Sequence, residues 1–230
     1  MINIRTLAIG ALGLAFSTHS LHGQARSGYR DFQLGADLPS ISVLAGVAAS
    51  QAKTIHLRPA VMQELQWQRP YSLDTTPALA DPVKQIVFSF YDDQLTRMVV
   101  DYDHDRTAGL TAADLIDAIS TEYGPQRKPG VRTSRGVPSQ VEEESGTPVA
   151  RWGGADYSLV LYQSSYTSAF RIIVTSPRLE ALARTADAQA TRLDEREAPL
   201  REIARQKKDA EDARVSQEKA RVTNRAAFRP

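Results

Sequence analysis

The sequence predicts an α+β fold: a mostly antiparallel sheet of hairpins with two short helices, followed by a long C-terminal α-helix whose spacing also fits a coiled coil. Three observations lead to this prediction. Apolar and polar residues alternate in pairs of short segments between residues 53 and 175. A capped helical pattern begins at Thr111. Residues 177–230 are rich in Ala, Arg, Glu, Asp and Gln, contain no glycine, and have one internal proline, Pro199, near which we expect a kink.

Residues 1–25 have the pattern of a secretory signal peptide. Arg5 precedes an uncharged, largely apolar run at residues 6–16, and small residues stand at Gly23 and Ala25. The run is shorter than the roughly 20 residues that a membrane-spanning helix needs, so cleavage after Ala25 is favoured over an uncleaved anchor. We therefore expect a periplasmic or secreted protein with no transmembrane span after signal cleavage.

Composition narrows the classes of partner. The chain contains no cysteine, which excludes disulfides and a lipid-modified cysteine and leaves stability to the core. The formal net charge is +1, with a small acidic excess in residues 26–177 and a small basic excess in the tail. Neither excess is large enough to predict binding to nucleic acid or to an anionic membrane.

The predicted domain spans residues 26–176 and begins with a short helix. Asp37 or Ser40 can cap this helix, since a short polar side chain accepts a free backbone N–H there. Residues 53–58 and 62–69 then predict two short strands, each followed by a proline.

The clearest strand signal lies in a hairpin. Ile86, Phe88 and Phe90 alternate with less apolar residues, which fits a strand with one buried face. Residues 91–94 form a polar turn, and residues 95–102 return as the second strand.

A helix follows with signals at both ends. Thr111 and Asp114 form a capping box, and Gly124 followed by Pro125 ends the pattern with a left-handed glycine. The apolar stripe of this helix comprises Ala112, Leu115, Ile116, Ile119 and Tyr123. We expect this stripe to pack on the sheet.

Residues 128–148 are polar, contain three glycines and include three consecutive glutamates at residues 142–144. This composition predicts a mobile loop, with room for one edge strand. Residues 157–163 and 169–175 then predict a second hairpin.

The order of these elements resembles that of the small α+β modules of exported bacterial proteins. The motifs that carry the resemblance are Phe-Gln-Leu-Gly at residues 32–35, the hairpin at 88–100 and the helix end Tyr-Gly-Pro at 123–125. Outer-membrane assembly lipoproteins and the β-lactamase-inhibitor-protein fold are such modules. The resemblance covers residues 29–176 and implies a protein-binding role, although this chain lacks the lipidated cysteine of the lipoproteins.

One acidic segment suggests a metal site. Asp101, Asp103 and Asp105 alternate around His104, and Ca²⁺ prefers several oxygen ligands on a tight turn. The spacing fails to match a calcium loop, because Arg106 stands where the motif starting at Asp101 needs glycine. A polar strand end that runs into a helix cap explains the same residues, so we expect no cofactor and keep calcium as the alternative.

Catalytic signatures are absent from the sequence. Beyond the signal only His56 and His104 remain as histidines, and no nucleophile elbow, zinc-protease or phosphate-loop motif occurs. A non-enzyme is therefore favoured over a hydrolase-like or calcium-dependent enzyme built around His104. The aromatic residues are favoured to belong to the sheet core, because aromatic residues are enriched in strands. The alternative is a binding face, for which Trp67, Tyr162 and Tyr166 are the candidates.

Apolar residues in the tail recur at alternating three- and four-residue steps. They are Leu179, Leu182, Ala186, Leu193, Leu200 and Ile203. This helix seam fits either a coiled coil or a helix docked on the body, and it decays beyond Ile203. We expect an exported, non-enzymatic protein-binding or scaffolding module of the bacterial cell envelope, whose partner is another envelope protein or a second copy. The third hypothesis is a purely structural oligomer held together by the tail.

Overall fold

The computed structural model describes residues 27–70, 81–127, 141, 144–164 and 169–229. The predicted signal peptide, most of the predicted loop at 128–148, and Tyr166 lie outside these residues. The helices are α1 (Leu38–Ala45), α2 (Ala112–Tyr123) and α4 (Pro177–Ala227), with short 3-10 turns at Ala49–Gln51 and Asp105–Thr107. The strands are β1 (Gly28–Tyr29), β2 (Phe32–Gln33), β3 (Lys53–His56), β4 (Met62–Gln68), β5 (Val83–Tyr91), β6 (Gln94–Tyr102), β7 (Thr147–Gly153), β8 (Ser158–Gln163) and β9 (Phe170–Thr175).

Seven strands form one sheet in the order β3-β4-β5-β6-β9-β8-β7, and β1 and β2 form a separate two-stranded sheet. Neighbouring strands in the large sheet are antiparallel throughout. The α+β prediction is therefore confirmed, as are both predicted hairpins, β5–β6 and β8–β9. The two hairpins join through β6 and β9, where Val99 lies opposite Ile173.

One face of the sheet carries the main core. Phe88, Met98, Leu161 and Ile172 are essentially inaccessible to solvent and point to this face. Helix α1 and the apolar stripe of α2 pack against them, together with Tyr29 from β1. The burial of these apolar side chains is the main favourable contribution to the stability of the fold.

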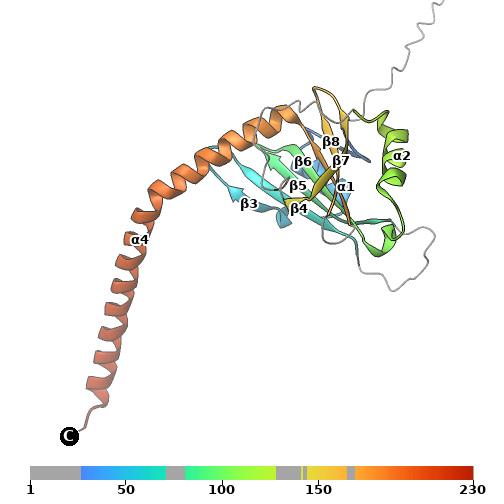
Figure 1. The fold of residues 1–230 in the computed structure, drawn as a ribbon. Coiled ribbons are helices and arrows are strands. Elements are labelled where there is room, and N and C mark those ends of the chain that lie inside the picture. The colour runs from blue at the N-terminus through green and yellow to red at the C-terminus, as the bar shows by residue number, and fades with distance from the viewer. Residues whose placement is uncertain (1–26, 71–80, 128–140, 142–143, 165–168, 230) are drawn as a thin grey trace, which may run out of the picture.

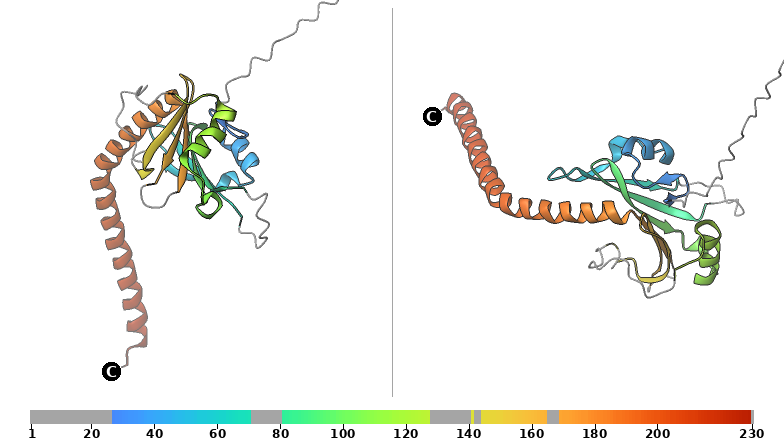
Figure 2. Two further views of the ribbon diagram at one scale, coloured as in Figure 1. Left: turned by 45° about the vertical axis from the view of Figure 1, so that its right-hand side comes forward. Right: turned by 90° about the horizontal axis from the view of Figure 1, so that it is seen from above.

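The opposite face carries a smaller cluster and the docked part of α4. Val99, Val160, Tyr162 and Ile173 are buried together there. Helix α4 starts directly after β9 and runs toward β3 (Figure 1), on the face opposite the core that α1 and α2 cover. The free end of α4 points away from the body in every view (Figure 2).

Local sequence signals account for the helix ends. Asp37 caps α1 by accepting the backbone N–H of Ser40 at 2.8 Å. Thr111 and Asp114 form the predicted capping box at the start of α2. Gly124 ends α2 with a φ of 81°, but its ψ of −174° is extended, so the expected left-handed exit is wrong in detail.

The β5–β6 turn ties neighbouring elements to the sheet. Asp92 and Asp93 both have positive φ, which matches the right-handed twist of a two-residue hairpin. The carboxylate of Asp92 accepts the backbone N–H of Val61 at 2.9 Å, and that of Asp93 accepts the N–H of Leu38 at 3.0 Å. Asp92 and Asp93 thus form the β5–β6 turn and also bind the residue before β4 and the first residue of α1.

Strand β7 is an edge strand, as the predicted loop left room for, but most of it lies beyond that loop, in residues 149–153, for which no strand was predicted. It begins at Thr147, inside the predicted loop, and forms the edge of the sheet next to β8. Its sequence, Thr-Pro-Val-Ala-Arg-Trp-Gly, lacks a clean alternation and contains a proline, which is tolerated at an edge because the outer N–H groups need no partner. The packing of Trp152 and Ala150 into the core stabilises it as a strand.

Helix α4 has 51 residues and is about 75 Å long at 1.5 Å per residue. It contains Pro199 and bends partway along its length (Figure 2). The long C-terminal helix is therefore confirmed. Pairing of this helix into a coiled coil stays a prediction. Among the described residues, no helix combines the length and the hydrophobicity that a membrane span requires.

Candidate functional site: docking of the long helix on the sheet

Helix α4 is anchored where it leaves the sheet. The backbone N–H of Ser176 donates to the carbonyl of Thr96 at 2.9 Å, and the Ser176 hydroxyl caps the helix. The docked face then consists of Leu179, Ala183, Ala186 and Ala190, all of them buried. Alanines allow the helix backbone to approach the sheet closely, and their spacing of three and four residues keeps them on one face.

A partly buried ion pair lies beneath this docked face. Arg97 on β6 donates to Glu180 on α4 at 3.1 Å, and their side chains are only 16% and 12% exposed. The Nε atom of Arg97 is buried and has no hydrogen-bond partner among the described residues. Glu180 is therefore the principal compensation for a charge that the sheet withdraws from water.

A cleft of about 200 Å³ lies beside this ion pair, between α4 and strands β3 to β6. Its walls include Met62, Phe90, Arg97, Ala183 and Asp187. Apolar and charged side chains alternate around it, and Arg97 and Glu180 already neutralise each other. The cleft is thus part of the helix–sheet interface.

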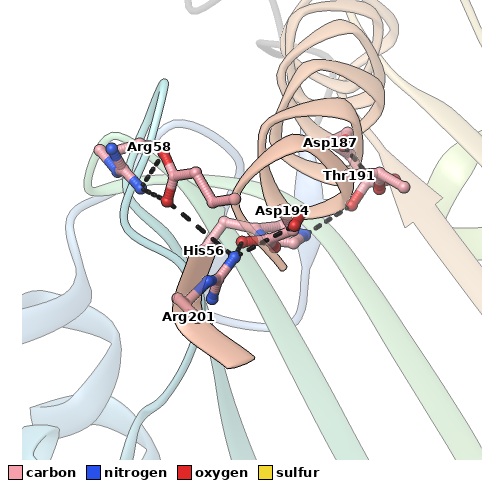
Figure 3. A network of polar contacts seen from close by, with 7 residues as sticks. His56, Arg58, Asp187, Thr191, Asp194 and Arg201 are labelled. Carbon is pink, nitrogen blue, oxygen red and sulfur yellow. Dashed lines mark hydrogen bonds and ion pairs between the residues drawn. The ribbon is translucent and has the colours of Figure 1, made fainter. Parts of the chain in front are cut away.

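Beyond the cleft, polar and charged side chains connect α4 with the edge strand β3 and with the residues that follow it. We call His56, Arg58, Asp187, Asp194, Glu197 and Arg201 the edge cluster (Figure 3). The Nε2 atom of His56 lies 3.1 Å from a carboxylate oxygen of Asp187, and its Nδ1 atom lies 3.9 Å from one of Asp194. One histidine on the edge strand β3 therefore lies between two carboxylates that are seven residues, or about two turns, apart on the helix.

Arg58 makes the second contact of the edge cluster. One of its terminal nitrogens donates to both oxygens of Glu197, at 2.8 and 3.0 Å. Arg201 in turn donates to Asp194 at 2.8 Å. Hydrogen bonding to Arg201 lowers the pKa of Asp194, and hydrogen bonding to Arg58 lowers the pKa of Glu197. Both carboxylates are therefore ionised at neutral pH and available for the contact.

The predicted aromatic binding face is only partly realised. Trp67 lies on β4, half-buried against the main core. Tyr162 is 3% exposed, among Val99, Val160 and Ile173. The expectation that Tyr162 forms an exposed binding surface is wrong, because β8 is an inner strand whose second face is also covered.

Two of the three aspartates of the proposed calcium loop have other partners. Asp101 accepts Arg171 Nε at 2.5 Å, and Asp103 is paired with Arg69. Asp105 belongs to a 3-10 turn, next to an exposed His104. Within the described part of the chain, no three His, Asp or Glu side chains converge as metal ligands would.

The predicted seam of α4 divides between two environments. Leu179 and Ala186 belong to the docked face, and Leu193 is half-buried. Leu182, Leu200 and Ile203 are 44%, 68% and 61% exposed. Leu182 therefore does not belong to the docked seam, because Ala183, one residue on, faces the sheet in its place.

Sequence reasoning did not identify the edge cluster. A signal was nevertheless present: Glu180, Asp187 and Asp194 are spaced by seven residues, which places three acids in one row beside the docked face. His56 could not be matched to this row, nor Arg58 to Glu197, because 131 and 139 residues separate the paired positions.

Comparison of the chain with family models, curated proteins and solved structures gives no match. The resemblance to exported α+β modules thus stays a prediction from element order.

Proposed function

We propose that this protein is an exported, non-enzymatic scaffolding module of the bacterial cell envelope, in which the α+β body holds a long helix for contact with a partner protein. The observation that carries the proposal is the division of α4. Its first half is fixed to the sheet by a docked apolar face and two sets of ion pairs. From residue 204 to 229 every residue is exposed.

A free helix of this kind needs its own stabilisation. Three Glu-to-Arg pairs at i,i+3 spacing supply part of it, at Glu202–Arg205, Glu211–Arg214 and Glu218–Arg221. A helix that is exposed on all sides and stabilised in this way is typical of a solvent-exposed spacer between bodies. The edge cluster sets the orientation of the free half, since its contacts keep α4 on the sheet up to the point where the helix leaves the body.

The assignment to the cell envelope is supported by the signal-peptide pattern of residues 1–25. It is tested by expressing the full chain in a bacterium and sequencing the N-terminus of the protein found outside the cytoplasm. We expect the sequence to begin near Arg26. Retention in the cytoplasm with Met1 in place would contradict the assignment.

The scaffolding role is tested by photo-crosslinking in the cells that make the protein. A photoreactive residue is placed at Ala213 on the free half of α4 and, as a matched control, at Ala118 on α2; both are exposed helical alanines. We expect a discrete protein adduct from Ala213, none from Ala118, and a weaker adduct when Arg58→Glu breaks the edge cluster. Equal labelling from both positions, or no adduct at either, would remove the basis for the proposal.

A further inference from the structure

The free half of α4 has two chemically different sides. We call residues 201–227 the arm, about 40 Å of helix at 1.5 Å per residue. At about 100° per residue, one line of apolar side chains runs along it: Leu200, Ala204, Val215, Val222 and Ala226. This line continues the docked face of α4, but here it is exposed to solvent.

Basic residues accumulate on the same side as this apolar line. Eight lie within the arm: Arg201, Arg205, Lys207, Lys208, Arg214, Lys219, Arg221 and Arg225. All eight fall within about 100° of the line on either flank. We call the apolar line and these flanking residues the basic face.

The opposite side contains no basic residue. It carries Glu202, Gln206, Asp209, Ala213, Gln217 and Asn224. Three acids do lie on the basic face, and two of them, Glu211 and Glu218, are each neutralised by an arginine at 2.7 Å. Arg201 and Arg205 are likewise paired, with Asp194 and Glu202. The basic charge that no ion pair among the described residues compensates therefore lies on one side of the arm, at Lys207, Lys208, Lys219 and Arg225.

We propose that the basic face of the arm binds the surface of an anionic phospholipid bilayer. Lysine and arginine side chains next to an apolar line can extend to lipid phosphates while Leu200, Val215 and Val222 enter the headgroup region. A bilayer is flat, and basic side chains on both flanks of a straight helix reach it together. A partner helix fits less well, because Glu211 and Glu218 interrupt the apolar line that helix pairing requires.

The proposal goes beyond the scaffolding function and rests on the arm alone. Bound in this way, the arm would present the side with Ala213 away from the lipid, where a protein partner can reach it. A failure of lipid binding therefore leaves the crosslinking test of the scaffold intact, and the reverse also holds.

The test is sedimentation of the purified chain with vesicles of phosphatidylcholine that contain about one third phosphatidylglycerol, compared with phosphatidylcholine alone. We expect binding only to the anionic vesicles, weakening as salt screens the attraction. The first variant carries Lys207→Gln, Lys208→Gln, Lys219→Gln and Arg225→Gln, and leaves the three i,i+3 pairs intact. Each replacement should weaken binding about fivefold, and together about a hundredfold or more.

The matched control changes the net charge by the same amount on the opposite side. It carries Gln206→Glu, Ala213→Glu, Gln217→Glu and Asn224→Glu, and far-UV circular dichroism checks that both variants stay helical. Retained binding in the control supports the basic face. Equal loss in both variants, equal binding to neutral vesicles, no binding at low salt, or tighter binding to a short DNA duplex than to the vesicles would overturn the proposal.

Discussion

Replacing Glu180 by Gln tests the docking of α4 at its most buried polar contact. The substitution keeps the shape of the side chain but removes the charge that compensates Arg97, whose Nε atom already lacks a partner among the described residues. We expect the free energy of unfolding to fall by about 2 kcal/mol. The reason is that the guanidinium stays in the interface without its counter-ion.

The magnitude follows from the exposure of the pair. Breaking a fully buried ion pair on one side costs roughly 3–5 kcal/mol. The side chains of Arg97 and Glu180 keep 16% and 12% of their exposure, and the new amide oxygen can still accept one hydrogen bond, so part of this cost is offset. Removing both charges, with Arg97→Met and Glu180→Leu, should restore stability to within about 1 kcal/mol of the parent protein.

The assay is urea denaturation followed by far-UV circular dichroism, with native-state hydrogen exchange of the amides between Ala183 and Ala190. Exchange distinguishes undocking of the helix from unfolding of the whole domain. Glu195→Gln, at an exposed position of the same helix, is the control and should change stability by less than about 0.5 kcal/mol. The reasoning is refuted if Glu180→Gln equals this control, or if the double variant is as unstable as the single one.

Three further predictions concern the rest of α4. Hydrogen bonding to Arg58 lowers the pKa of Glu197, so this exposed contact contributes above the ordinary carboxylate range and is lost as pH falls below about 4. Spin labels beside Arg58 and on α4 near Glu197 should move apart on acidification while the buried docked face stays in place, and no change in their separation would contradict this. Pro199→Ala removes a helix-breaking ring that costs about 3 kcal/mol and should straighten α4, which small-angle scattering detects as a longer particle. Leu193→Asp with Leu200→Asp should dissociate any assembly formed through the tail while the body stays folded. Light scattering of the variant, and of the chain with and without residues 178–230, measures the mass of the particle. An unchanged mass and an unchanged melting temperature would contradict a role of the seam in assembly.

Much of the fold could be predicted because its signals are local. The capping box of Thr111 and the alternation of Ile86, Phe88 and Phe90 depend on residues a few positions apart. The position and extent of strand β7 could not be predicted, since its alternation is weak and Trp152 is buried only by contacts with distant elements. For the same reason the sequence left two environments open for Tyr162, the core and a binding face, and its place on an inner strand decides for the core.

The candidate site was less predictable than the fold. An acidic row at Glu180, Asp187 and Asp194 was visible in the sequence, but its partners His56 and Arg97 were not. The basic side of the arm was likewise hidden, because total charge says nothing of how the charges are distributed around a helix.

The sequence by itself determined the α+β class, the hairpins and the capped helices, because turn chemistry, capping and hydrophobic period act between near neighbours in the chain. Only the tertiary structure decided that β6 pairs with β9, that alanines form the docked face of α4, and that the helix is held at the β3 edge before it leaves the body. These features depend on contacts between residues far apart in the chain. Such contacts form once the sheet brings those residues together.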